Sequence, residues 1–146
     1  MTGYPASFIV YFKTLPVTLT SLRKAVLFSL WQAKKPLKAY EILEYLTGVD
    51  FTATATSVYR ALDFFMAAGL LHKIESIQAY ALCLTPHVEH STEMLMVCDR
   101  CHDVTESHDE ALRFLLAQLA SSASFQISQD VIELKGVCRA CQSEQP

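Results

Sequence analysis

No apolar run in the sequence approaches the roughly 20 residues that a membrane-spanning helix needs. The first residues also lack the basic segment that precedes the apolar part of an export signal; Phe8 to Phe12 is only a short apolar run. Charged residues make up only 18% of the 146, while 51% are hydrophobic. We therefore expect a folded cytoplasmic protein of one domain or two very small ones, with no membrane contact. Disulfides are not expected, because they form in oxidising compartments.

Charge is divided unevenly along the chain. Residues 1–84 carry eight Lys/Arg against five Asp/Glu, a charge of +3, whereas residues 85–146 carry four against ten, a charge of −6. A basic half is weak evidence for a polyanionic partner, since scattered lysines usually only solvate a surface. Any nucleic-acid contact is nevertheless expected in the first half. A change in character near residues 84–86 predicts two domains, 1–84 and 85–146.

The first half has the apolar spacing of three helices followed by a hairpin. The expected helices cover residues 20–31, residues 39–46 and a segment that follows a threonine cluster and ends at Gly69. Two short apolar segments, 70–75 and 79–84, predict the hairpin. This order is that of a winged helix-turn-helix, in which the third helix enters the major groove of DNA.

The outward face of the third predicted helix carries Ser57, Tyr59, Arg60 and Asp63. Arginine can read guanine through two hydrogen bonds, and tyrosine can reach a phosphate or a thymine methyl group. An exposed ion pair between Arg60 and Asp63 on an ordinary helix is the alternative, and taken alone it would be the more common one.

The second half predicts a small α+β domain. Strands are expected at 94–97 and 103–107, a helix at 109–120, and strands at 124–128 and 131–137. The helix should bury one apolar face, formed by Leu112, Leu115, Leu116 and Leu119. So small a domain buries little core by itself, and we expect a metal and a partner subunit to stabilise it.

Four of the five cysteines form two pairs with two residues between the members, Cys98 with Cys101 and Cys138 with Cys141. Each pair can supply half of a tetrahedral thiolate site, and two such pairs predict structural zinc. The 36 residues between the pairs can hold a strand, a helix and two returning strands. Disulfides or buried thiols without metal are the alternatives. Residues 98–102, CDRCH, also match the c-type haem attachment pattern, which needs export and leaves the second pair unexplained.

Further candidate ligands gather at the junction of the two halves: His72, Cys83, His90 and Glu106. If the hairpin forms, Cys83 lies across from His72. One thiolate with two imidazoles and a carboxylate suits tetrahedral zinc, whereas a site of only nitrogen and oxygen ligands would admit iron or manganese. Each residue alone is more often a core thiol or a surface polar group. A zinc enzyme with Glu89 as general base is another class, but no pocket-forming segment surrounds Glu89.

Several segments together resemble the ferric uptake regulator family, in particular its zinc-sensing branch. They are ATSVYRALDF at 55–64, GLLHKIES at 69–76, MVCDRC at 96–101, and VIE at 131–133 with the closing cysteine pair. The resemblance covers roughly residues 17–142. It implies a dimeric repressor of bacterial cytoplasm, not an enzyme, that takes no small-molecule substrate. Such a repressor binds AT-rich inverted repeats of double-stranded DNA when loaded with metal and shuts off uptake genes.

The resemblance also implies roles for single residues and two zinc ions per chain. The structural site would be Cys98, Cys101, Cys138 and Cys141, and the sensing site His72, Cys83, His90 and Glu106, with His87 as a possible replacement for His90. The expected DNA contacts are Tyr40, Thr56, Ser57, Tyr59 and Arg60. A peroxide-sensing member with an iron site stays as an alternative, against which Cys83 argues.

Overall fold

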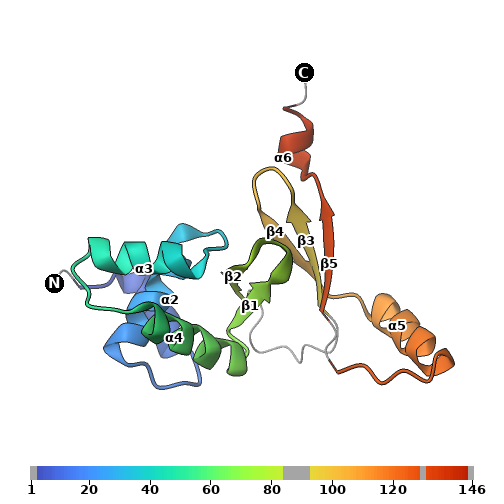
Figure 1. Cartoon of the computed structure of the whole chain (residues 1–146), viewed down its shortest axis with the longest axis horizontal. Helices are drawn as coiled ribbons and strands as arrows, with labels where there is room; N and C mark the ends of the chain where they lie inside the picture. Colours follow the sequence, from blue (N-terminus) through green and yellow to red (C-terminus); the bar gives the residue numbers. More distant parts are fainter. Residues whose placement is uncertain (1–2, 84–92, 129–130, 145–146) are drawn as a thin grey trace. The chain divides into compact units, whose positions relative to one another are not determined.

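The computed structural model describes residues 3–83, 93–128 and 131–144 in two compact units, Met1–Pro86 and His87–Pro146 (Figure 1). Both units combine helices and strands, so the predicted α+β class is confirmed. The domain border that the sequence predicts, between 84 and 85, falls at the edge of the undescribed range 84–92 and stays a prediction. None of the helices within the described residues has the length and apolar character that crossing a bilayer requires.

The first unit holds four helices: α1 Ala6–Lys13, α2 Ser21–Ala33, α3 Ala39–Gly48 and α4 Ala55–Ala67. The sequence predicted the last three and missed α1. Seven of its eight residues, ASFIVYF, are apolar or small, so no polar face marks a helical period. Aromatic packing holds it instead. Phe8 is fully buried, with its ring centroid 5.0 Å from that of Phe28 and 5.4 Å from that of Trp31.

Side-chain caps fix where α4 begins. The Thr54 hydroxyl accepts a hydrogen bond from the Ser57 backbone N–H at 3.1 Å, and the Ser57 hydroxyl accepts one from the Thr54 N–H at 2.9 Å. This reciprocal capping box satisfies two donors that a helix start would leave free. At the other end Gly69 has φ +75°, a left-handed conformation that glycine adopts without cost. The helix is thereby bounded at both ends, as the threonine cluster and Gly69 predicted.

A two-stranded wing follows, formed by β1 Leu71–Ile74 and β2 Ala79–Leu82 in antiparallel register. A single 3-10 turn, Glu75–Ile77, joins the strands. The wing is also bound to the segment before α3, because Leu37 and Tyr80 exchange two backbone hydrogen bonds of 2.9 and 2.8 Å. The helices and the wing therefore form one body.

The core of this unit lies between α2, α3 and α4. Its fully buried side chains include Val26, Leu27, Ile42, Leu46, Val58, Leu62 and Phe65. The guanidinium of Arg23 stacks on the ring of Phe64 at 3.6 Å, a cation–π contact between α2 and α4.

The second unit is a three-stranded sheet with two helices. Its elements are β3 Glu93–Cys98, β4 Val104–Ser107, α5 Glu110–Ser122, β5 Val131–Gly136 and the single-turn helix α6 Arg139–Gln142. β3 is central, antiparallel to β4 and parallel to β5. Its Leu95 and Val97 are buried, while no residue of α5 is.

Two expectations for this unit are wrong. Residues 124–128 form no strand in the described chain: Ser124 turns with φ +53° after α5, and the side chain of Phe125 stays 66% exposed. The leucine face of α5 is not buried either, since Leu115 is 54% and Leu119 66% exposed. The apolar pattern is present, but no surface among the described residues covers it.

Candidate metal centres and nucleic-acid interface

The two cysteine pairs meet at one end of the second unit. Cys98 ends β3, Cys101 lies in the turn that follows, Cys138 caps α6, and Cys141 is within α6. The four sulfur atoms all lie within 4.8 Å of one another, and each thiol is free. Strand β3 and the parallel strand β5 carry the two pairs to the same edge of the sheet.

The spacing of these sulfurs fits zinc. Metal–sulfur bonds of about 2.3 Å in a tetrahedron place the sulfurs about 3.8 Å apart. The Sγ atoms of Cys101 and Cys138 are 3.7 Å apart. A disulfide would need about 2.05 Å. The arrangement is that of four ligands around an ion, and it uses both pairs, which haem attachment through the first pair would not.

Backbone amides and neighbouring sulfurs act on these thiols in opposite directions. Backbone N–H groups, first that of Cys138 at 3.4 Å, lower the pKa of Cys98 to about 6. The Cys138 side chain, followed by burial, raises the pKa of Cys141 to about 12. At Cys101 the Asp103 N–H lowers the pKa, but the Cys98 side chain and burial outweigh it and raise the pKa above 9.0. Crowded sulfurs therefore keep protons that a metal must displace.

The wing carries a second pair of candidate ligands. His72 of β1 is paired with Ala81, so Cys83, two residues further along, is its diagonal neighbour rather than its direct partner. The Cys83 N–H donates to the Leu70 carbonyl at 2.9 Å, which extends the pairing. A ring nitrogen of His72 and the Cys83 sulfur lie within 4.8 Å of each other. The expected nearness of these two residues is confirmed.

The other two expected ligands belong to the second half of the chain. Glu106 lies on β4 opposite Leu95. His90 and its possible replacement His87 lie outside the described residues. Their participation in a site stays a prediction.

The N-terminal part of α4 and the start of α3 present the expected nucleic-acid contacts. On α4, Thr56 and Arg60 are exposed and Tyr59 is 50% exposed. In the part of the chain that the structure describes, Arg60 and Asp63 form no ion pair, so the guanidinium is available to another partner. Ser57 is less accessible, and its hydroxyl both accepts from and donates to Thr54. Its part in the capping box is to hold α4 in place.

Tyr40 projects from the first turn of α3 with 59% of its surface exposed. The Lys38 ammonium lies 6.0 Å from the centre of its ring. Lys38 was not among the expected contacts, although its position two residues before Tyr40 in a basic half was a usable signal. Lys38 and Tyr40 at the start of α3, like Tyr59 and Arg60 on α4, are cationic and aromatic groups suited to contact with a phosphate backbone.

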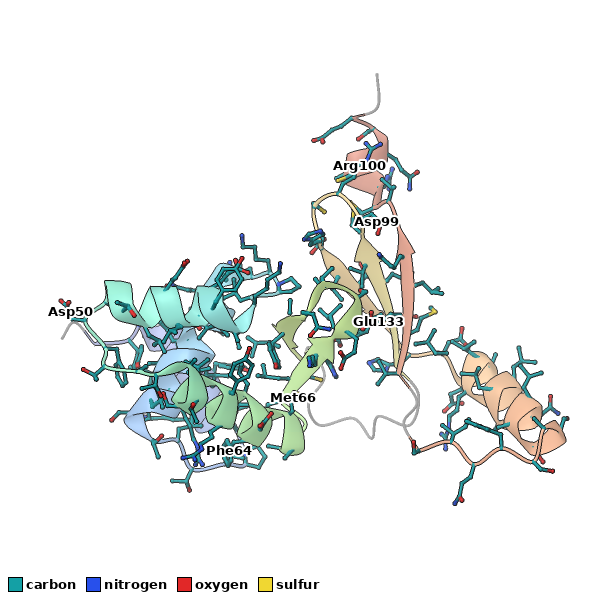
Figure 2. The ribbon with its side chains drawn as sticks, viewed as in Figure 1. Asp50, Phe64, Met66, Asp99, Arg100 and Glu133 are labelled. Atoms are coloured by element: carbon teal, nitrogen blue, oxygen red, sulfur yellow. The ribbon has the colours of Figure 1, made fainter. Side chains whose placement is uncertain are left out.

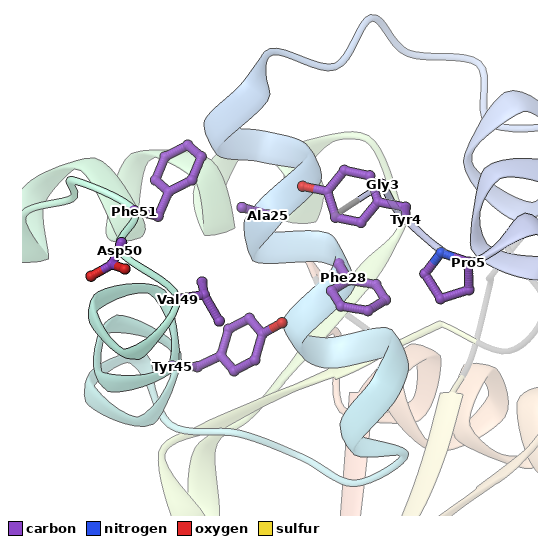
Figure 3. Close-up of a pocket in the computed structure, with 9 residues that line it drawn as sticks. All are labelled: Gly3, Tyr4, Pro5, Ala25, Phe28, Tyr45, Val49, Asp50 and Phe51. Atoms are coloured by element: carbon purple, nitrogen blue, oxygen red, sulfur yellow. The ribbon is translucent and has the colours of Figure 1, made fainter. Parts of the chain in front are cut away.

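Figure 3 shows a cavity of about 570 Å³ in the first unit, bordered by Tyr4, Phe28, Tyr45 and the turn that follows α3. Burial raises the pKa of both tyrosines. Its described lining includes no cysteine or histidine, and Asp50 is the carboxylate that borders it.

Comparison with known proteins agrees with this combination of parts. The model of the Ferric uptake regulator family matches residues 15–135.

The chain belongs to the ferric uptake regulator family.

Members of this family are transcription regulators and not enzymes. Among curated proteins, the zinc uptake regulation protein of Escherichia coli K12 is 35% identical over 125 residues, which are 86% of this chain and 73% of that protein. A ferric uptake regulation protein of Neisseria meningitidis is 29% identical over 115 residues, 77% of this chain and 76% of that one.

Two solved structures are similar to this chain in both fold and sequence. A zinc uptake regulator complexed with zinc and DNA has a TM-score of 0.82 at 33% identity, covering 94% of this chain and 92% of that one. Holo XcZur has a TM-score of 0.80 at 34% identity, covering 94% and 98%.

The affinity of the four cysteines for zinc is expected to depend steeply on pH. Since the pKa values of Cys101 and Cys141 are raised above 9.0, both thiols hold protons at pH 7 and must lose them on binding. We expect at least two protons to be released per zinc, so that affinity rises about 100-fold per pH unit near neutrality. Competition with a chelator of known pH dependence at pH 6.5, 7.0 and 7.5 measures the slope. An affinity that does not change with pH would contradict this.

Proposed function

We propose that this protein is a zinc-responsive transcriptional repressor of zinc uptake genes that acts in the cytoplasm as a homodimer on double-stranded DNA. The observation that carries the proposal is that a ring nitrogen of His72 and the sulfur of Cys83 lie within 4.8 Å of each other at the wing of a helix-turn-helix unit. A soft thiolate beside an imidazole favours zinc over iron or manganese. The likeness to a zinc uptake regulator bound to zinc and DNA supports the same assignment.

One zinc would be structural, held by Cys98, Cys101, Cys138 and Cys141. When bound, it would supply a cation that joins the two cysteine pairs at one end of the sheet in a closed four-ligand site without an open position for substrate. The sulfur spacing supports this role, and so does the small core of the unit. This zinc should be lost only when its surroundings unfold.

A second zinc would be the one that is sensed. Its ligands would be His72 and Cys83 from the first unit, with Glu106 and His90 (or His87) from the second. Zinc can favour one arrangement of two units only if it binds that arrangement more tightly. Ligands drawn from both units provide such a difference, because any arrangement that separates the units cannot use all four.

The DNA contacts would come from α4 and the start of α3. Arg60 would read a base, and Tyr59, Thr56 and Tyr40 would contact bases or phosphates, while Ser57 holds the helix start. A dimer with twofold symmetry presents two copies of α4, which matches an inverted repeat. We propose an AT-rich inverted repeat as the operator.

The exposed apolar side chains of the second unit support the homodimer. Within α5, Phe114 is 63%, Leu115 54% and Leu119 66% exposed, and on the sheet Val131 and Leu134 are each 48% exposed. Exposed apolar surface of this extent is typical of an interaction site. A second copy of the chain would cover it.

Replacement of Cys83 by serine tests the zinc assignment. The change keeps the size of the side chain but removes the soft donor, and a hydroxyl is a far weaker ligand for zinc. We expect half-maximal operator binding to need at least about tenfold more free zinc. Fluorescence anisotropy of labelled operator in zinc buffers measures this shift. One tightly held zinc per chain should remain, which serves as the internal control. An unshifted curve would leave Cys83 as a core thiol and reopen the choice between zinc and iron.

Replacement of Arg60 by alanine should weaken specific binding by about 1–3 kcal/mol, because two hydrogen bonds to one base are lost. Preference for the operator over unrelated DNA should fall by a similar factor. Lys34→Ala, which removes an exposed lysine at the end of α2, is the matched control and should cost little on any sequence. Equal losses from both variants on both DNAs would mean that Arg60 touches only phosphate.

Replacement of Leu119 by glutamate should dissociate the dimer, since a charge would be buried in the proposed interface. We expect the dissociation constant to rise on the order of 100-fold. Sedimentation velocity at micromolar concentration measures the change. Gln118→Glu adds the same charge at the neighbouring exposed position and should leave the dimer intact. A Leu119→Glu protein that sediments like the wild type would exclude α5 from the interface.

A further inference from the structure

We infer that Arg100 is a positioning residue of the four-cysteine centre, where it ties the first cysteine pair to the second and slows the release of zinc. The inference rests on the proposed function, which assigns a structural zinc to these cysteines. Arg100 is one of the two residues between Cys98 and Cys101, where sequence reasoning treated it only as a spacer.

Its guanidinium reaches across the centre. Nη1 of Arg100 donates a hydrogen bond of 3.1 Å to the backbone carbonyl of Cys141, 41 residues away in sequence. Figure 2 shows Arg100 at the end of the unit beside α6. Cys141 itself is 7% exposed. A side chain from the first pair thus holds the main chain of the last cysteine.

The neighbouring residue Asp99 fastens the other end of the same segment. Its N–H donates to the Gly136 carbonyl at 2.7 Å, and its carboxylate forms a 3.6 Å ion pair with Lys135. These contacts hold the chain before Cys138, whereas the Arg100 bond holds it at Cys141. Helix α6 between them is only four residues long, too short to be stable alone. Its position therefore depends on contacts of this kind.

Charge adds to the geometry. Four thiolates around one Zn²⁺ carry a net charge of −2, which a neighbouring cation stabilises. Because the carboxylate of Asp99 already pairs with Lys135, the charge of Arg100 is left to act on the centre. Release of zinc by separation of the two pairs would also require the Arg100 bond to break. Outer contacts of metal ligands typically change affinity by about 10–100-fold.

The test is the rate of zinc release to an excess of 4-(2-pyridylazo)resorcinol, followed by absorbance, from protein loaded with zinc. We expect Arg100→Gln to release the resistant zinc about tenfold faster, with an unchanged association rate. Arg139→Gln is the matched control, because it removes the same charge from an exposed position in the second pair. Its release rate should stay within about twofold of the wild type.

Two results would overturn the inference. One is zinc release from Arg100→Gln at the wild-type rate. The other is equal acceleration of zinc release by Arg139→Gln, which would mean that only the net charge matters. If Arg100→Gln does not fold, Arg100→Lys is the second variant, because it keeps the charge but not the planar donor. Zinc release from Arg100→Lys at the wild-type rate would refute the role of the hydrogen bond. The Co²⁺-substituted proteins should share one thiolate-to-metal charge-transfer spectrum. Wild-type protein without a chelator-resistant zinc would instead refute the proposed structural site.

Discussion

In the proposed zinc-loaded protein, attraction between the cation and four thiolates is the interaction on which the second unit depends. Its sheet has three strands, and few of its side chains are buried, with Leu95 and Val97 on the central strand. Hydrophobic burial of that extent stabilises a small domain only marginally. The cysteines lie where β3 ends and where the chain leaves β5, so a metal there closes the open end of the sheet. In the proposed homodimer, the uncovered face of α5 would pack against the second subunit.

The first unit is stabilised mainly by hydrophobic packing. Its helices bury a continuous apolar core, reinforced by the rings of Phe8, Phe28 and Trp31, and need no metal to do so. Its proposed metal ligands, His72 and Cys83, lie at the wing, outside that core. The core that stabilises this unit and the proposed sensing residues are therefore in different parts of it. In the second unit, by contrast, the proposed metal would itself stabilise the fold.

Local rules predicted most of the helices and strands. Caps and terminators such as Thr54 and Gly69 act through neighbouring backbone groups, and therefore they can be read from sequence. The cysteine spacing and the nearness of His72 to Cys83 followed from equally local patterns, but the diagonal register of His72 and Cys83 did not. Helix α1 was missed because nearly all its residues are apolar and show no period. The exposure of Leu119 and the contact from Arg100 to Cys141 depend on surfaces and residues far away in sequence, which a pattern does not show.

The two backbone hydrogen bonds between Leu37 and Tyr80 have a consequence for how such regulators diversify. They join the wing, with its metal ligands, to the segment that leads into Tyr40, and they do so through main-chain atoms alone. The side chains that we propose to select a metal and those that we propose to select a DNA sequence are thus connected through the main chain. Substitutions in one set leave the backbone connection intact. A chain built this way can acquire a new metal while keeping its operator, or a new operator while keeping its metal.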